Sequence, residues 1–344
     1  MNVDNIQTNR HALEVQEEFK KLNIIPDNSK INSYIQLHGG ADTTIFEIGF
    51  QNHSTKYIQR IFRPYASNQT AEFEYSVQKT LFENKINVPE TYMIKLTPNT
   101  REKPYFIMEK VEGTRLDQVF NKKPEQLEQL VGKFLQELHK IHSIDPNLFP
   151  KIPSPDIQKN PYALIEQTLT RRKSVLEKFP TELKELKPVI DWLENNKTNN
   201  PCRKLVVIHG DYHPFNIIVQ EDLKYQILDW TGVNISDFRM DLGFASVVIS
   251  VGESKNLAPM IASTYEQISR TKVENLSYFM ILANTFNLIR FYSGINNPTI
   301  TNETEDTMNF FKSLKEYPLL LVELVKETCN IDLRQIEDYF NVEG

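Results

Sequence analysis

Apolar and polar residues alternate with a period of two through much of the first third of the chain, and this pattern predicts strands of a half-buried sheet. A polar turn that contains Gly39 and Gly40 separates the first run from a returning one, which predicts a hairpin. The predicted strands cover 31–37, 45–50, 56–63, 92–94 and 105–108.

Farther along the chain, apolar residues recur every three or four positions, which is typical of amphipathic helices. Helices are also predicted within the first part, at 10–22 and 69–84. The later helices are predicted at 127–142, 162–179, 183–195, 259–269, 276–292 and 308–328. Strands followed by helices indicate an α+β fold, with a small antiparallel-sheet lobe over 1–108 and a larger, mainly helical lobe over 109–344.

Two short β-branched runs, at 206–208 and 217–219, interrupt the helical part and enclose a polar loop. The loop holds Asp211 and Asn216, and Asp229 follows a third apolar run. A single Asp or Asn in a loop is usually a turn former or a cap. Two strands flanking the loop would bring the three side chains together, however. Metal-assisted phosphoryl transfer needs such a set, with a carboxylate near the attacking hydroxyl and oxygen ligands for Mg²⁺.

Composition narrows the choice of partners and compartment. The 344 residues are 40% hydrophobic and 24% charged, with a net charge of −6 and no basic stripe, so no nucleic-acid partner is expected. The two cysteines form no disulfide framework, and the N-terminus has no apolar signal core, so a cytoplasmic protein is expected. The apolar stretch 276–294 is interrupted by polar residues and predicts a buried helix, not a membrane span.

The pattern His-Gly-Asp at 209–211, with Asn216 and then Asp229-Trp230, resembles the aminoglycoside phosphotransferase and choline kinase-like family of small-molecule kinases. This resemblance implies a protein kinase-like two-lobed fold, with nucleotide binding in the first lobe and catalysis and substrate binding in the second. It assigns Asp211 to the attacking hydroxyl, and Asn216 and Asp229 to Mg²⁺. Trp230 and Thr231 depart from the Asp-Phe-Gly triplet of protein kinases, which favours the small-molecule branch.

The same resemblance points to two backbone elements for the nucleotide. Gly39 and Gly40 would let the backbone approach phosphate oxygens, although hairpin turns use paired glycines routinely. The segment 108–113 resembles the hinge between lobes, where backbone groups of Glu109 and Val111 would read the adenine edge.

Arg60, on the third strand, and Glu74, on the following helix, occupy the positions of the family's phosphate-binding basic residue and its orienting glutamate. Protein kinases use Lys at the strand position, yet a guanidinium can also clamp phosphate. The alternative is a surface Arg on an edge strand, with Lys56 as the reserve candidate. Downstream, Asp241 is expected to cap a helix and to hydrogen-bond the catalytic loop, and His209 is expected to brace that loop.

Two other function classes stay open. In a metal-dependent hydrolase, His209, Asp211 and His213 would form a ligand cluster with Asp229. That reading leaves Asn216 and Arg60 unexplained. The second class is a catalytically silent nucleotide-binding module.

The expected reaction is transfer of the γ-phosphoryl group from ATP, with GTP as an alternative, to a hydroxyl of a small molecule in the presence of Mg²⁺. Family acceptors include aminoglycosides, macrolides, choline, homoserine and sugars. Glu166, Glu194 and the pair Glu337 and Asp338 are candidates for binding a cationic acceptor, although each also fits an exposed helix position.

Overall fold

Two compact units make up the chain. The structure is a computed structural model that describes residues 10–37, 43–62, 68–97, 103–251, 257–301, 309, 312–313 and 315–341. The first unit comprises Met1–Arg115 and Ile217–Trp230, and the second comprises Leu116–Asn216 and Thr231–Gly344. The predicted glycine turn, Gly39 and Gly40, lies outside the described residues.

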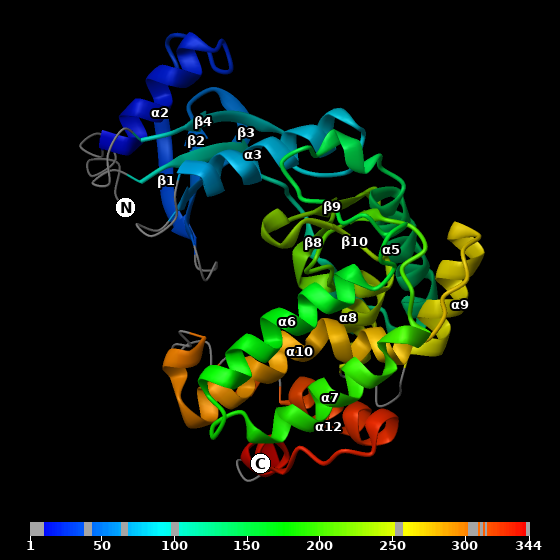
Figure 1. Ribbon diagram of the computed structural model, residues 1–344. Helices are drawn as coiled ribbons and strands as arrows, with labels where there is room; N and C mark the ends of the chain where they lie inside the picture. Colours follow the sequence, from blue (N-terminus) through cyan, green and yellow to red (C-terminus); the bar gives the residue numbers. More distant parts are fainter. Residues whose placement is uncertain are drawn as a thin grey trace. The chain divides into compact units, whose positions relative to one another are not determined.

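A five-stranded antiparallel sheet forms the first unit's framework (Figure 1), in the order β1-β2-β3-β5-β4. The strands are β1 (Ile31–Leu37), β2 (Thr43–Phe50), β3 (His53–Phe62), β4 (Thr91–Lys95) and β5 (Tyr105–Glu109). Each of the five predicted strands is confirmed, although β3 begins at His53 and not at residue 56. The register places Arg60 of β3 between Ile45 of β2 and Phe106 of β5.

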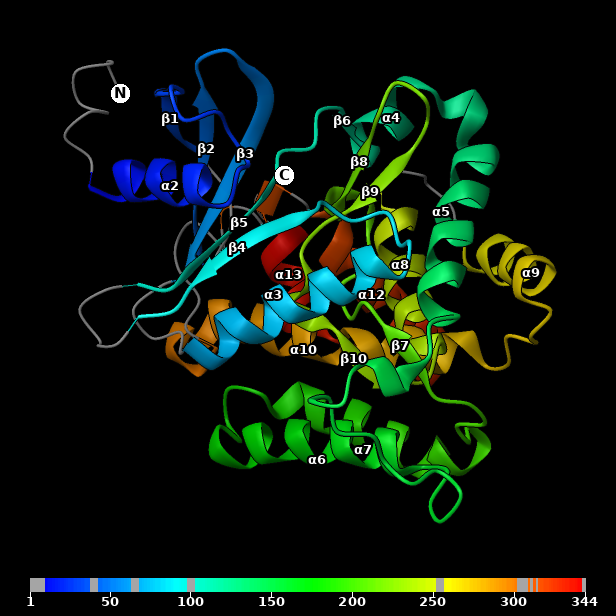
Figure 2. The ribbon, with the colours of Figure 1, turned by 90° about the horizontal axis from the view of Figure 1, so that it is seen from above.

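Helix α2 (Arg10–Lys21) covers one face of this sheet, as Figure 2 also shows. Its Phe19 ring packs against Phe50 and Tyr57, with centroids 5.5 and 4.7 Å apart. These aromatic contacts explain why a short N-terminal helix is retained, because a helix of this length is marginal without a packed face.

Helix α3 (Asn68–Glu83) covers the other face, where Ala71 joins a cluster with Phe62 and Phe106. Successive strand residues point to opposite faces, so Arg60 and Phe62 lie on the same side of β3. The alternation that predicts this strand therefore also directs Arg60 toward α3.

A second, three-stranded sheet completes the first unit, in the order β6-β8-β9. Its strands are β6 (Thr114–Arg115), β8 (Ile217–Val219) and β9 (Tyr225–Ile227). Gly113 precedes β6 with φ +153°, and a Cβ there would lie 2.4 Å from the carbonyl oxygen of Val219. Only glycine permits this close approach of the two backbones.

The second unit is mainly helical (Figures 1 and 2). Its helices are α4 (Leu116–Lys122), α5 (Leu127–His142), α6 (Ala163–Lys178), α7 (Lys187–Asn196), α8 (Arg239–Ser250), α9 (Ala258–Ser269), α10 (Leu276–Asn296), α12 (Glu316–Cys329) and α13 (Arg334–Asn341). Helix α10 is the central element and packs against α8, α12 and α6. Gly243 of α8 allows this packing, because a Cβ there would lie 2.6 Å from the backbone of Phe279.

Two of the predicted helices need correction. The first turn of the helix predicted at 183–195 is a 3₁₀ helix (Lys184–Leu186), and α7 begins at Lys187, with a proline in its first turn. The helix predicted at 308–328 is not continuous: the described residues 309, 312 and 313 are helical, but Lys315 lies in a turn and α12 begins at Glu316. Pro188 and Pro318 suit first-turn positions, where a helix lacks backbone acceptors for N–H groups.

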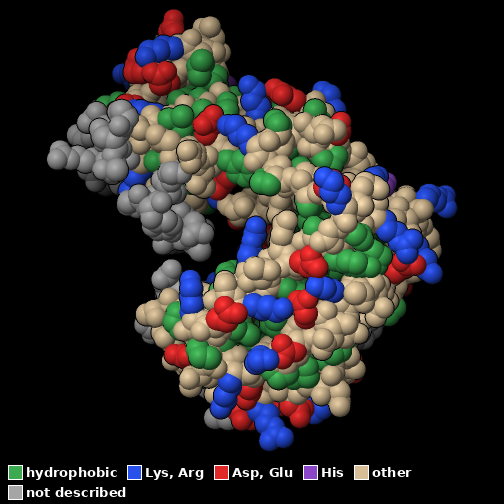
Figure 3. All heavy atoms as spheres, in the orientation of Figure 1, with side chains coloured by type: hydrophobic (Ala, Val, Ile, Leu, Met, Phe, Trp, Pro, Cys, Tyr) green, Lys and Arg blue, Asp and Glu red, His purple; other side chains and the backbone are tan. Residues whose placement is uncertain are grey.

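A short antiparallel pair, β7 (Val206–Ile208) and β10 (Asn234–Ser236), lies among these helices. Acidic and basic side chains are interspersed over the face shown in Figure 3. Within the described ranges, no helix combines the length and the apolar character that crossing a membrane requires.

Candidate active site

In the first unit, Arg60 joins two acidic side chains that are distant in sequence. Its Nε lies 3.2 Å from Glu74 Oε2, and its terminal nitrogen lies 3.4 Å from Asp229 Oδ1. Arg60 and Glu74 are buried, whereas the Asp229 side chain is 37% exposed. Buried charges persist in proteins when they are paired, so this ion-pair network fixes the guanidinium on its strand. The reserve candidate, Lys56, instead pairs with Glu47 at 2.7 Å.

The backbone of Asp229 adopts a left-handed conformation, with φ +62°. An L-residue rarely adopts this conformation, and such residues concentrate at functional sites. Asp229 follows β9, and the next side chain, Trp230, is buried and donates from Nε1 to the Ile227 carbonyl oxygen at 3.4 Å. Burial of Trp230 thereby orients the carboxylate that precedes it.

In the second unit, the loop after β7 is held by Asp241 of α8. The Asp241 carboxylate accepts the backbone N–H groups of His209 and Gly210, each at 2.8 Å. Its Oδ2 also lies 3.2 Å from His142 Nε2. The expected contact between Asp241 and the catalytic loop is thus confirmed. The expected helix cap is wrong, because Phe238 occupies the N-cap position and no side chain caps the helix there.

Gly210 and Tyr212 also stabilise the conformation of this loop. Gly210 has φ +80°, and a Cβ there would lie 2.1 Å from the carbonyl oxygen of Gly232. The buried hydroxyl of Tyr212 donates to the Phe134 carbonyl oxygen of α5 at 2.8 Å. His209 is fully buried and accepts the N–H of Asp211 at Nδ1, 3.3 Å away, so it braces the loop as expected.

Asp211 and Asn216 contact each other within this loop. Asn216 Nδ2 donates to Asp211 Oδ2 and to the Asp211 carbonyl oxygen, both at 3.1 Å. His213 Nε2 lies 3.3 Å from the same carboxylate oxygen. Burial raises the pKa of Asp211, but the hydrogen bond and charge of His213, with smaller effects of His209 and Asn216, outweigh burial. The pKa therefore lies below its ordinary value of 3.8, and the carboxylate is ionised at neutral pH.

A cavity of about 330 Å³ opens beside Asp211 within the second unit. Its lining includes Gly210, Asp211 and Asp241, with Arg172 of α6 and Phe286 and Arg290 of α10. Two of the carboxylates that are candidates for binding a cation are engaged elsewhere. Glu166 pairs with Lys197 at 2.9 Å, and Glu194 pairs with Lys173 at 2.8 Å.

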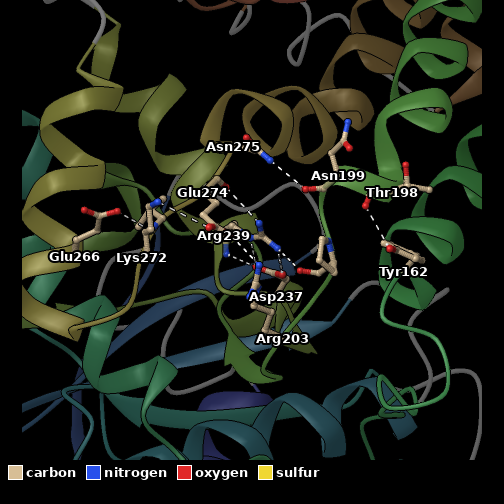
Figure 4. Close-up of polar contacts among 12 residues, drawn as sticks. Tyr162, Thr198, Asn199, Arg203, Asp237, Arg239, Glu266, Lys272, Glu274 and Asn275 are labelled. Atoms are coloured by element: carbon tan, nitrogen blue, oxygen red, sulfur yellow. Dashed lines mark hydrogen bonds and ion pairs between the residues drawn. The ribbon is translucent and has the colours of Figure 1, made fainter.

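A buried ion pair fixes the start of α8, the helix that carries Asp241. Arg239 binds Asp237 through two hydrogen bonds, of 2.9 and 2.7 Å. In Figure 4 the Arg239 guanidinium also donates to backbone carbonyl oxygens, those of Pro201 at 2.8 Å and Glu274 at 3.3 Å. The fork geometry of arginine suits such multiple acceptors.

The hinge candidates lie at the end of β5 in the first unit. The N–H of Glu109 donates to the Glu90 carbonyl oxygen at 2.8 Å, and the N–H of Lys110 donates to the Lys56 carbonyl oxygen at 2.9 Å. The N–H of Val111 has no hydrogen-bond partner among the described residues.

The metal-dependent hydrolase hypothesis requires a cluster of metal ligands, which can be sought among the described residues. Among them, no group of three or more His, Cys, Asp or Glu side chains is arranged to hold a metal ion. His209 and His213 instead make the hydrogen bonds and contacts given above.

Known structures share this architecture. A Ralstonia eutropha protein provisionally assigned as an aminoglycoside phosphotransferase superposes with a TM-score of 0.70 at 15% identity, over 92% of this chain and 98% of that one. The GDP and kanamycin complex of APH(2″)-IIIa gives 0.62 at 15% identity, over 89% and 99%. Spectinomycin phosphotransferase APH(9)-Ia, with ADP and spectinomycin, gives 0.56 at 12% identity, over 92% and 98%. The fold is therefore α+β and protein kinase-like, with an antiparallel-sheet lobe and a mainly helical lobe.

The sequence comparison identifies the family. The model of the phosphotransferase enzyme family, APH, matches residues 33–275, and the chain belongs to this family. No curated protein matches the chain in sequence.

Proposed function

We propose that this protein is a small-molecule kinase that transfers the γ-phosphoryl group of ATP, or of GTP, to a hydroxyl group in a Mg²⁺-dependent reaction. The observation that carries the proposal is the ion-pair network of Arg60, Glu74 and Asp229. Kinases need a basic strand residue paired with a helix glutamate, together with a metal-binding aspartate. Structures with the same fold hold ADP or GDP, which supports a nucleotide substrate here.

Arg60 would bind the α- and β-phosphates, and Glu74 would keep its guanidinium directed at them. A guanidinium donates two parallel hydrogen bonds to phosphate oxygens, so the Arg for Lys replacement preserves phosphate binding. Gly39 and Gly40 would allow the backbone to approach the phosphates. The Glu109 carbonyl oxygen and the Val111 N–H would bind the adenine edge. The division into a nucleotide-binding lobe (1–108) and a catalytic and substrate-binding lobe (109–344) belongs to the same proposal.

The donor set fits Mg²⁺, which prefers hard oxygen ligands. Asp229 offers a partly exposed carboxylate. The Asn216 amide nitrogen is occupied by Asp211, which leaves the amide oxygen of Asn216 available. When bound, the ion would neutralise charge on the phosphates. Ile217 of β8 pairs with Ile227 of β9; in the chain, Asn216 immediately precedes β8, and Asp229 lies two residues after the end of β9.

Asp211 would orient the acceptor hydroxyl and accept its proton. Its carboxylate lines the cavity, is ionised at neutral pH and is fixed by hydrogen bonds. Phosphoryl transfer has a loose transition state, so positioning of the nucleophile contributes more than base strength. A small-molecule acceptor and a cytoplasmic location complete the proposal, with no nucleic-acid or membrane partner.

The test measures Mg²⁺-dependent ADP formation from ATP, alone and with a panel of hydroxyl acceptors. Asp211→Asn preserves size and removes the charge, so kcat is expected to fall by at least about 100-fold. The matched control, Asp191→Asn, changes an exposed acid of α7 and should leave kcat unchanged.

Arg60→Met tests the nucleotide half, and KM for ATP is expected to rise about tenfold. An Asp211→Asn enzyme within twofold of wild type would exclude the proposed chemistry. Wild-type protein that binds Mg-ATP but never forms ADP would indicate a catalytically silent nucleotide-binding module.

A further inference from the structure

Arg172 introduces a positive charge into the wall of the acceptor cavity. Its Nε donates to Thr285 Oγ1 at 3.1 Å, and its guanidinium lies 5.0 Å from the Phe286 ring centroid. No Asp or Glu among the described residues forms an ion pair with it. One neutral hydroxyl and one ring face leave most of the five N–H donors of an arginine for another partner.

Partial burial makes this charge costly. Desolvation, with a smaller effect of the neighbouring Arg171, lowers the pKa of Arg172 to about 10. The side chain stays protonated at neutral pH. A desolvated cation without a counter-charge is unfavourable, and a bound anion would offset that cost.

A second cation comes from α10, where the cavity-lining residues Ala283, Phe286, Asn287 and Arg290 recur every three or four positions. This spacing places them on one face of the helix. Asn287 is fixed by a 2.6 Å hydrogen bond to the Tyr317 hydroxyl of α12. The part of the lining that α6 and α10 contribute thus presents Arg172, Arg290 and an ordered amide.

The acidic side of the cavity offers little to a cation. The Asp241 oxygens already accept the N–H groups of His209 and Gly210. Asp211 carries the proposed catalytic role, and Asn216 and His213 contact its carboxylate. The two acidic side chains of the lining are therefore already engaged, whereas Arg172 has no acidic partner among the described residues.

We propose, on the basis of the phosphotransferase function above, that the acceptor is a small hydroxyl compound with an anionic group, a carboxylate or a phosphate. Arg172 and Arg290 bind that group, while the hydroxyl faces Asp211. A cavity of about 330 Å³ lies at the small end of ligand sites, which suits a compact acceptor. This acceptor differs in charge from the kanamycin bound by the structurally similar APH(2″)-IIIa.

The test uses acceptors of similar size that differ in charge: glucose, glucosamine, glucuronate and glucose 6-phosphate, with kanamycin as a polycation. Affinities are measured by isothermal titration calorimetry on full-length protein. The wild type is expected to bind an anionic sugar about 10- to 100-fold more tightly than glucose, as charge-assisted hydrogen bonds predict. Preference for glucuronate indicates a carboxylate acceptor, and preference for glucose 6-phosphate indicates a phosphate.

Arg172→Gln should abolish the preference, and Arg172→Lys should retain part of it. The matched control, Arg171→Gln, removes the adjacent, exposed arginine and should retain the whole preference. The wild-type series tests the proposal even if Arg172→Gln does not fold.

Three results would overturn the inference: equal affinity across charges, tighter binding of glucosamine or kanamycin, or no binding of either anionic sugar. Mg²⁺-dependent formation of ADP from ATP, alone and with each acceptor, is measured on the same preparations. Its absence would refute the phosphotransferase proposal separately, because anion preference does not depend on nucleotide turnover.

Discussion

Replacing Asp241 with Asn tests whether one carboxylate holds the loop at 209–216 in shape. Asp241 is 1% exposed and accepts two backbone N–H groups at 2.8 Å, those of His209 and Gly210. An Asn of the same size keeps one acceptor oxygen and turns an NH₂ group toward the other N–H. One charge-assisted hydrogen bond is lost and a buried donor is left without an acceptor, which costs roughly 2–4 kcal/mol.

Two measurements check this estimate. Denaturant unfolding should show a loss of about 2–4 kcal/mol in the free energy of unfolding, with an unchanged m value. In hydrogen exchange, the amide of Gly210 or of His209 should exchange roughly 30- to 1,000-fold faster than in the wild type. This factor is the loss of about 2–4 kcal/mol converted into a ratio of exchange rates. The control Asp191→Asn should change neither quantity. An Asp241→Asn protein within about 0.5 kcal/mol of wild type, with normal protection of both amides, would refute the reasoning.

Three further predictions concern the same loop. Gly210→Ala should lower the melting temperature and the yield of folded protein, because its Cβ would meet the Gly232 carbonyl oxygen at 2.1 Å in a left-handed conformation; wild-type stability would contradict this. Tyr212→Phe should cost about 1–2 kcal/mol in unfolding free energy, because the Phe134 carbonyl oxygen loses a buried donor. The pKa of Asp211 lies below 3.8 in the folded protein, so its charge stabilises the fold above that pH and the effect disappears on acidification below it. The difference in unfolding free energy between wild type and Asp211→Asn should therefore shrink as the pH falls below about 4; a difference that stays the same from pH 5 to pH 2 would contradict the assignment.

Local periodicity accounts for most of the fold that the sequence predicts. Alternation along β3 correctly places Arg60 on the α3 side of the sheet, where Glu74 meets it. Hydrophobic periodicity does not predict elements that are short or that lack an amphipathic pattern. Strand β6 has only two residues, too few to show an alternating pattern. Helix α8 is buried on nearly every side and has no polar face. The spacing of apolar residues therefore predicts neither element.

The supporting contacts of the site depend on tertiary structure. Asp241 carries the features of a helix cap in sequence, yet its carboxylate accepts loop amides from more than thirty positions earlier in the chain. Arg172 lies in a helix rich in charged residues, and its sequence neighbours do not distinguish a cavity wall from a solvated face. The residue types and spacing of the motif can be read from the sequence, whereas the helix face that lines the cavity cannot.

The catalytic loop takes its anchors from α5 and α8, through Phe134 and Asp241. The cavity's two arginines belong to other helices, α6 and α10. Under the proposed function, substitutions at positions 172 and 290 should change acceptor selectivity while the contacts that hold the loop at 209–216 stay intact. A library randomised at these two sites should yield folded variants with new selectivity far more often than one randomised within 209–216.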